Sequence, residues 1–379
     1  MILITNGGDT LLECGFGYIF QQLTSWKQMT LKDSLTVCVI PGDDAAPEAM
    51  AATLRVLKSL DAAISWDCLP EGRELLELDS NDREKFVTER IDAASTVLFG
   101  ATNGVTPGAR YMRWGKSTYA NVRPIKWFPG FNSPLHSPAG IDYVIVRENL
   151  EDMYVGIMGP ASKLLEANLT DPRSHVPEDA ADGRFATKII TRSGTERVTR
   201  FACELATQRQ NKITVSAKTN MLPATDKWFC EIAKEIVQEY PHLHYEEFII
   251  DDLAHRLVMR PHELDVVLLP NLYGDILSDL GAGTIGGLGL APSGCYGADF
   301  AYFEPAHGTA PDISGLGVIN PTATLLSATL MFRHLGLFSA ANRLDNAIRQ
   351  VYTIGKELTQ DQGGTSTTEE FADAVIGEL

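Results

Sequence analysis

The feature that most limits the fold of this chain is the alternation of short apolar, β-branched runs with longer segments of helical periodicity. The run at 35–40 reads Leu-Thr-Val-Cys-Val-Ile and ends at a Pro-Gly-Asp-Asp turn. Because parallel strands are buried on both faces and joined by helices, this alternation predicts an α/β fold with a largely parallel sheet. Further strands are expected at 95–99, 143–146, 213–216, 248–250 and 265–269.

A helix is well marked after residue 320. Asn320 is expected to be its N-cap and Pro321 its first residue, with Gly336 ending it. Residues 160–195, in contrast, are polar and weakly periodic, which predicts a protruding arm or a long loop.

The charge balance excludes some classes of partner. The 379 residues contain 32 Lys and Arg against 49 Asp and Glu, a formal net charge of −17. Such a surface repels phosphate groups, so neither nucleic acid nor an anionic membrane is expected to bind. Six scattered cysteines lack metal-binding spacing. Residues 1–33 resemble neither a secretion signal nor a transit peptide, so we expect a leader of unknown role on a cytoplasmic protein.

Two aspartates suggest a metal site. Asp275 and Asp279 are four residues apart, so on a helix their carboxylates share one face. Stacked carboxylates repel each other unless a cation lies between them, and oxygen ligands suit Mg²⁺ or Mn²⁺. Asp251, after an apolar run, is a candidate third ligand. The alternative is a solvated polar helix face, since acidic pairs at this spacing are common.

Four arginines cluster in sequence, and two of them, Arg123 and Arg147, lie near predicted strands, as do two proton-transfer candidates. Guanidinium groups bind carboxylates in bidentate fashion, although pairing with surface acids is the competing interpretation. Lys218 and Tyr154 could exchange protons with a ligand there. The arginines are Arg110, Arg113, Arg123 and Arg147.

One glycine-rich segment matches a dinucleotide-binding motif but lacks the context that the motif requires. The segment 281–286 matches Gly-x-Gly-x-x-Gly, but it does not follow a strand, so we interpret it as a loop and not as a dinucleotide-binding turn. The segment 304–313, Glu-Pro-Ala-His-Gly-Thr-Ala-Pro-Asp-Ile, is a better candidate for nucleotide binding, since its turn-forming residues leave backbone amides free.

Four motifs in order carry a resemblance that covers residues 39–336. They are Tyr-Ala-Asn-Val-Arg-Pro at 119–124, Val-Arg-Glu-Asn at 146–149, Asn-Leu-Tyr-Gly-Asp-Ile-Leu-Ser-Asp at 271–279, and the segment 304–313. Together they resemble the β-decarboxylating dehydrogenases, the family of isocitrate, 3-isopropylmalate, homoisocitrate and tartrate/malate dehydrogenases.

The resemblance implies an isopropylmalate-dehydrogenase-like two-domain α/β fold with mixed and parallel strands, distinct from the Rossmann fold. A large, cofactor-side domain would comprise 34–134 and 284–379. A small domain, 135–283, would carry a dimerisation arm and the metal-site residues. The chain would form a homodimer whose two protomers share each active site.

The resemblance also implies roles for individual residues. Arg113, Arg123 and Arg147 would bind substrate carboxylates, and Asp275 and Asp279 would hold Mg²⁺ or Mn²⁺ with Asp251 of the partner subunit. Lys218 of the partner subunit would take the hydroxyl proton as hydride leaves for the nicotinamide, and Tyr154 would protonate the enol after CO₂ departs. The cofactor would contact Asn220, Glu304, His307, Gly308, Asp312, Ile313 and Asn320.

Two positions suggest the choice of cofactor and substrate. Asp312 followed by Ile313 is the pattern of NAD-using members, because a carboxylate repels a 2′-phosphate. Isopropylmalate dehydrogenases have leucine where Arg110 stands, and an arginine facing an isopropyl group would be unpaired. Arg110 followed by Tyr111 is most similar to homoisocitrate dehydrogenase, so a substrate with a third anionic group is expected. A 3-isopropylmalate or malate/tartrate dehydrogenase is the alternative.

The chain departs from the family at 42–46, where Gly-Asp-Asp-Ala-Ala replaces Gly-Asp-Gly-Ile-Gly. Loss of two glycines predicts a changed backbone near the cofactor. A non-catalytic regulatory subunit is the alternative from another functional class. The presence of the full acid, base and metal set favours the enzyme.

Overall fold

The computed structural model describes residues 35–71, 75, 77–167, 169 and 182–379. The predicted leader, 1–33, lies outside these described residues. The main body is built on one ten-stranded sheet in the order β2-β1-β3-β12-β11-β4-β5-β10-β8-β9. Its strands are β1 Leu35–Ile40, β2 Ile64–Cys68, β3 Thr96–Phe99, β4 Ala120–Lys126, β5 Asp142–Glu148, β8 Lys212–Ala217, β9 His244–Ile249, β10 Val266–Leu269, β11 Pro292–Tyr296 and β12 Ala301–Pro305.

The sheet is parallel towards both edges and antiparallel in the middle. On one side β12, β3, β1 and β2 pair in parallel, and on the other β5, β10, β8 and β9 do so. Between them β12, β11, β4 and β5 are antiparallel neighbours. The predicted mixed, largely parallel α/β fold is therefore confirmed.

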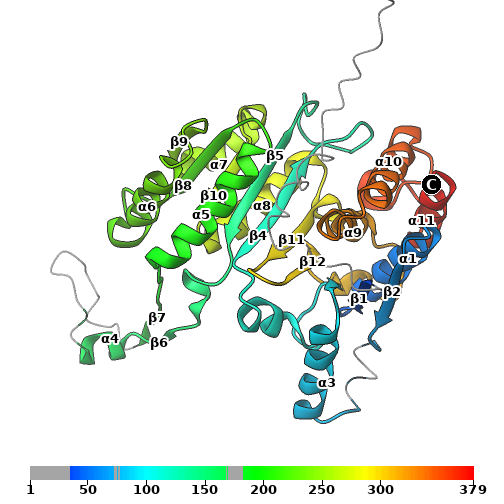
Figure 1. Ribbon diagram of the computed structural model, residues 1–379, viewed down its shortest axis with the longest axis horizontal. Coiled ribbons are helices and arrows are strands. Elements are labelled where there is room, and N and C mark those ends of the chain that lie inside the picture. The colour runs from blue at the N-terminus through cyan, green and yellow to red at the C-terminus, as the bar shows by residue number, and fades with distance from the viewer. Residues whose placement is uncertain (1–34, 72–74, 76, 168, 170–181) are drawn as a thin grey trace, which may run out of the picture.

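Helices cover the two halves of this sheet (Figure 1). Around β4, β5, β10 and β8 lie α5 Arg192–Thr207, α6 Trp228–Val237, α7 Ile250–Met259 and α8 Asn271–Ile285. Near β1, β3, β11 and β12 lie α1 Ala46–Ser59, α3 Ser80–Ala93, α9 Thr322–His334, α10 Phe338–Ile354 and α11 Thr368–Gly377. The apolar runs 37–40, 266–269 and 143–146 are almost fully buried, which explains why the sequence shows them as continuous apolar runs.

The expected strands are present, with small differences in their bounds. The run at 248–250 is the end of β9, which begins four residues earlier, and Ile250 already starts α7. Helix α9 begins at Thr322 with Pro321, not Asn320, in the N-cap position. Asn320 still contributes, since its Oδ1 accepts a hydrogen bond from the Thr322 backbone N–H at 3.0 Å.

The interpretation of 281–286 as a loop is wrong. Gly281 and Gly283 lie inside α8, and Gly286 ends this helix with φ +132°. A methyl group on Gly281 would lie 2.6 Å from the Tyr143 hydroxyl, so glycine is needed for α8 to pack on β5. The exclusion of a dinucleotide-binding turn at this place is unaffected.

The polar segment at 160–195 includes a protruding arm. Strands β6 Met158–Pro160 and β7 Arg184–Ala186 form a separate two-stranded sheet, and α4 Ser162–Glu166 follows β6 along the chain. These elements extend away from the main body (Figure 1). The predicted domain boundary at residue 134 lies between β4 and β5 along the chain. These two strands pair over seven residues, so the sheet is continuous across that boundary. The two-domain division stays a prediction. None of the described helices is long and apolar enough to cross a bilayer.

Candidate active site

The sheet register brings three polar side chains to one face of β4 and β5. Side chains two residues apart on a strand point to the same side, as Asn121 and Arg123 do. Asn121 is directly opposite Arg147 in the antiparallel pair, so Arg147 shares that side. Arg123 donates from Nε to Asn121 Oδ1 at 3.2 Å. Both arginines are nearly buried, with 7% and 3% of their surfaces exposed.

Asn271 joins two of the arginines. It is the first residue of α8, and its Oδ1 accepts from Arg147 Nε at 2.9 Å and Nη2 at 2.8 Å. The same oxygen accepts from Arg113 Nη2 at 3.1 Å. Three donors on one oxygen fix the guanidinium groups relative to the start of the helix.

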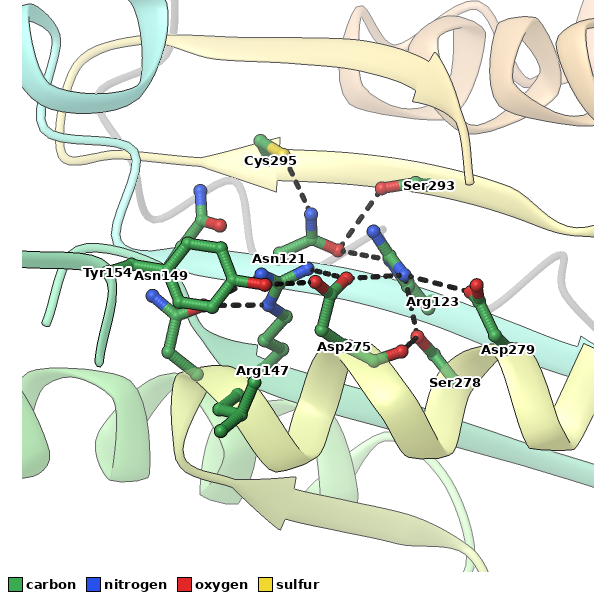
Figure 2. Close-up of polar contacts among 12 residues, drawn as sticks. Asn121, Arg123, Arg147, Asn149, Tyr154, Asp275, Ser278, Asp279, Ser293 and Cys295 are labelled. Atoms are coloured by element: carbon green, nitrogen blue, oxygen red, sulfur yellow. Dashed lines mark hydrogen bonds and ion pairs between the residues drawn. The ribbon is translucent and has the colours of Figure 1, made fainter. Parts of the chain in front are cut away.

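Helix α8 presents its carboxylates to these arginines (Figure 2). Asp275 is ion-paired with Arg147, and its Oδ1 lies 3.4 Å from Arg123 Nη1. Asp279 Oδ1 also lies 3.4 Å from Arg123 Nη1. Gly274 permits this approach, because a methyl group there would lie 2.6 Å from Arg147 Cβ. The predicted shared face of Asp275 and Asp279 thus turns towards the arginines and not simply to solvent.

Burial and charge shift the pKa values in opposite directions. Burial raises the pKa of Asp275, but Arg147, the Tyr154 hydroxyl and Arg123 together hold it below its usual value. Burial raises the pKa of Asp279 above its usual value, against the nearby Arg123. Burial and the charge of Arg123 lower the pKa of Arg147 to about 10, against the attraction of Asp275. Asp275 is therefore the more firmly ionised carboxylate.

Tyr154 completes this group. Its hydroxyl donates to Asp275 Oδ2, and burial together with that hydrogen bond raises its pKa. The Arg113 guanidinium carbon lies 5.0 Å from the ring centres of both Tyr154 and Trp114. Arg113 is thus held by two aromatic rings and by Asn271, which restricts it to one orientation.

A cavity of about 210 Å³ connects the arginines to the predicted nucleotide segment. Among its lining residues are Arg110, Arg113, Arg123, Glu304, His307 and Gly308. His307 Nδ1 is 2.7 Å from the Gly308 carbonyl oxygen, so Nδ1 carries the proton and Nε2 is an acceptor. Nε2 is buried without a hydrogen-bond partner among the described residues, which is the state expected of a group that binds a ligand.

The remaining nucleotide-segment residues lie beside this cavity or behind it. Asp312 is exposed, and Ile313 packs on the small cluster of Ala45, Ala49 and Ile319. Asn320 Nδ2 donates to Asp361 Oδ2 at 2.9 Å, so its amide is bound within the protein on both sides. Contact of Asn320 with a cofactor stays a prediction.

The altered loop at 42–46 retains Gly42 but has a left-handed backbone at a residue that is not glycine. Asp44 adopts φ +54°, a left-handed conformation that glycine tolerates best. Asn103 Nδ2 donates to Asp44 Oδ2 at 3.0 Å, and the Ala45 backbone N–H donates to the Thr309 carbonyl oxygen at 3.0 Å. The loop is therefore tied to the nucleotide segment despite the substitutions.

Lys218 and Asp251 form a separate pair. Lys218 Nζ donates to Asp251 Oδ1 at 2.5 Å, and the Asp251 side chain is 68% exposed. The hydrogen bond from Lys218 lowers the pKa of Asp251. Asn220 is exposed nearby in sequence. Within the described part of the chain, no three His, Cys, Asp or Glu side chains are placed to hold a metal.

The donor set of one chain therefore fits a divalent cation only in part. Asp275 and Asp279 offer two carboxylates on one helix face, which suits an oxygen-binding ion such as Mg²⁺ or Mn²⁺. Asp251, the predicted third ligand, is not beside them within one chain, and its exposed side chain is accessible to a second copy of the chain.

Sequence reasoning missed several residues that organise the site. Asn121 and Asn271 hold the arginines, and Glu48 accepts hydrogen bonds from the Gly315 and Gly317 backbone N–H groups at 2.5 and 2.7 Å. Their signal was present, since each lies within or next to a motif. Their partners lie more than 100 residues away, except for the Asn121–Arg123 pair, and only the fold brings them together.

The chain is similar to known proteins of one family. The model of the isocitrate/isopropylmalate dehydrogenase family matches residues 36–375. An isocitrate/homoisocitrate dehydrogenase from Thermus thermophilus is 38% identical over 351 residues, covering 90% of this chain and 98% of the relative. A regulatory chain of the mitochondrial NAD isocitrate dehydrogenase from Dictyostelium discoideum is 35% identical, covering 95% and 96%. The isocitrate dehydrogenase structure from Methylococcus capsulatus has a TM-score of 0.78 at 32% identity, covering 91% and 99%.

Proposed function

The chain belongs to the isocitrate/isopropylmalate dehydrogenase family of β-decarboxylating dehydrogenases, and from this membership we propose a specific activity. The chain oxidises and decarboxylates a 2-hydroxy acid that bears a β-carboxylate, using NAD and Mg²⁺ or Mn²⁺. The observation that carries this proposal is the joined group of Asp275, Arg123, Arg147 and Tyr154 beside the cavity of Glu304 and His307.

The arginines bind the substrate carboxylates. Arg123 and Arg147 are already desolvated and oriented, so little side-chain entropy is lost when an anion binds. Arg113, fixed by two rings and Asn271, adds a third donor group. Arg110, exposed at the cavity, binds a third anionic group of a substrate such as homoisocitrate or isocitrate.

Asp275 and Asp279 hold the divalent cation, together with Asp251 of the partner subunit. When bound, the cation supplies a Lewis acid for the hydroxyl oxygen and for the later carbonyl. Tyr154, whose hydroxyl already donates to Asp275, delivers a proton to the substrate carbon that loses CO₂. The hydroxyl proton passes to Lys218 of the partner subunit.

The cofactor is NAD. It binds along the segment 304–313, with His307 Nε2 as an acceptor and Asp312 facing the ribose hydroxyls. The chain works as a homodimer with shared sites, in the cytoplasm. The exposed pair of Lys218 and Asp251 supports the dimer, because within one chain it makes no described contact with Asp275 or Asp279.

A non-catalytic regulatory subunit is the second candidate, and the similarity to a regulatory chain of an NAD isocitrate dehydrogenase favours it. A regulatory subunit and an enzyme differ in whether all the acid, base and metal-binding residues of the site are present. Tyr154, Lys218 and the aspartates 251, 275 and 279 are all present here. That set favours a chain that turns over its ligand.

Purified enzyme is expected to form NADH with a tricarboxylic 2-hydroxy acid. The assay supplies homoisocitrate, isocitrate, 3-isopropylmalate, malate and tartrate in turn, each with Mg²⁺ or with EDTA, and follows absorbance of NADH. We expect fastest turnover with homoisocitrate or isocitrate, and loss of activity in EDTA that returns with Mg²⁺. No NADH from any acid would favour the regulatory subunit.

Arg110→Ala provides the matching control for substrate choice. It should lower kcat/KM for the tricarboxylic acid by about 10- to 100-fold, because a charge-assisted contact is lost, and leave malate almost unaffected. Efficient use of 3-isopropylmalate that is insensitive to Arg110→Ala would refute the proposed third anionic group.

The wild-type chain is expected to prefer NAD over NADP, since the carboxylate of Asp312 repels a 2′-phosphate. Changing Asp312 to Lys together with Ile313 to Tyr should move the ratio of kcat/KM values towards NADP by about 100-fold, as expected when a repulsive charge becomes attractive. Steady-state kinetics with both cofactors measures this ratio. A wild-type preference for NADP would contradict the assignment.

A further inference from the structure

A buried lysine outside the proposed catalytic set binds two buried aspartates. Lys188 Nζ lies 2.5 Å from Asp226 Oδ1 and 3.4 Å from Asp152 Oδ1. Both carboxylates have no exposed surface, and the lysine side chain is 11% exposed. The ammonium also lies 4.4 Å from the centre of the Tyr273 ring. We call Lys188, Asp152, Asp226 and Tyr273 the Lys188 cluster.

Asp226 connects the Lys188 cluster to Lys218. It lies in the short helical turn Pro223–Lys227, and its Oδ2 accepts from the Lys218 backbone N–H at 2.9 Å. The same oxygen accepts from the Tyr273 hydroxyl, also at 2.9 Å. Asp226 therefore fixes the backbone from which the Lys218 side chain extends towards Asp251.

Asp152 connects the cluster to Tyr154 and α8. It lies two residues before Tyr154, and its Oδ2 accepts from the Leu272 backbone N–H at 2.9 Å, at the start of the helix that carries Asp275. Its backbone also exchanges hydrogen bonds with Ile189, the neighbour of Lys188. With φ +67° Asp152 is in a backbone conformation that is strained for any residue except glycine, so surrounding contacts must hold it.

We infer that Lys188 is a positioning residue, which holds the backbone of Tyr154 and the backbone of Lys218 in one fixed arrangement through its two aspartates. The inference rests on the proposed function, in which these two residues transfer protons. The Lys188 ammonium balances one of the two buried negative charges of Asp152 and Asp226, and it connects the segment of Tyr154 to the segment of Lys218. Without it, the two carboxylates repel each other in a poorly solvated interior, and the strained turn at Asp152 loses its support.

Because Lys188 connects the segments of Tyr154 and Lys218, its loss should affect the rate of proton transfer more than the binding of substrate. The contacts of Lys188 are with Asp152, Asp226 and Tyr273 and with none of the four arginines that bind substrate in the proposal, so its loss should leave substrate binding largely intact. Proton transfer requires heavy atoms within hydrogen-bond reach, so small displacements of Tyr154 and Lys218 reduce the rate strongly.

The test compares Lys188→Met with the matched variant Lys212→Met. Lys212 is also partly buried and ion-paired, with Nζ 2.9 Å from Glu246 Oε2, but it lies at the opposite end of β8 from Ala217 and Lys218. With NAD, Mg²⁺ and the acid that wild type uses best, Lys188→Met should lower kcat by about 30-fold or more and change KM by less than about threefold. Lys212→Met should alter neither by more than about twofold.

A second readout isolates proton transfer from hydride transfer. By the proposed function, wild-type enzyme with Mg²⁺ and the 2-oxo product in D₂O should exchange a C3 hydrogen of that product for solvent deuterium, with no net oxidation. Proton NMR should show this exchange slowed in Lys188→Met to the same degree as kcat. Lys188→Arg, which keeps the positive charge, should recover part of both rates. A defect in general folding would lower both rates together through the concentration of active enzyme, so both rates are expressed per folded protein, measured by circular dichroism.

Asp226→Asn keeps the inference testable if Lys188→Met does not fold. It leaves Lys188 paired with Asp152 and retains an amide oxygen near the Lys218 backbone N–H, yet it should still lower kcat by about 10-fold at nearly constant KM. Either folded variant with kcat within about twofold of wild type contradicts the role of Lys188. Failure of the proposed function is distinct, because wild type itself would then form no NADH.

Discussion

Asp275→Asn is expected to lower kcat/KM by about 10³-fold or more. Asp275 contacts Arg147, Arg123 and Tyr154 in the structure. The amide removes the negative charge that would bind the cation and gives Tyr154 a weaker acceptor. Several kcal/mol of transition-state stabilisation should be lost, and each ~1.4 kcal/mol is tenfold in rate.

Steady-state kinetics over a range of Mg²⁺ concentrations measures this effect. Asp373→Asn provides the control. Asp373 lies on α11 and forms an exposed ion pair with Arg55 of α1, so its replacement should leave kcat/KM within about twofold. Thermal unfolding confirms that both variants are folded at the assay temperature. If Asp275→Asn keeps kcat/KM within about tenfold of wild type at saturating Mg²⁺, Asp275 does not hold the cation.

Much of the fold could be predicted from the sequence because burial on both faces of a sheet leaves continuous apolar runs. The strand predicted at 265–269 is β10, which begins one residue later, at Val266, so that Asp265 lies just outside it. The run at 35–40 is β1. The same reason explains two of the four arginines, since polar residues within or just after such runs lie on the face or at the end of a buried strand, as Arg123 and Arg147 do. Arg110 and Arg113 lie instead at the helical turn Tyr111–Gly115.

Other features depend on contacts that spacing does not encode. The glycines at 281 and 283 look like loop residues but lie in helix α8, where Tyr143 and Ile125 leave no room for a side chain at 281. The structure gives no such reason for glycine at 283. Asp152 and Lys188 carry no motif that marks them, and their importance follows from the two elements that Lys188 joins. The role of Asn271 likewise depends on the fold, which places its side-chain oxygen between two arginines.

Lys218 and Asp251 distinguish two models of the active site. In one, each active site lies within a single chain; in the other, these residues serve the site of a second copy. Protomers carrying Lys218→Met or Asp275→Asn should each be nearly inactive as homodimers. A mixed dimer has one site with both residues intact and one site with neither, if the sites are shared.

Activity of purified mixed dimers is the measurement that tests the account most directly. The two variants are produced together with different affinity tags, and dimers carrying both tags are isolated and assayed with NAD and Mg²⁺. The account predicts about half of the wild-type activity per dimer, since one of two sites is restored. Activity no higher than that of the two inactive homodimers, or failure to isolate a doubly tagged dimer, would contradict it.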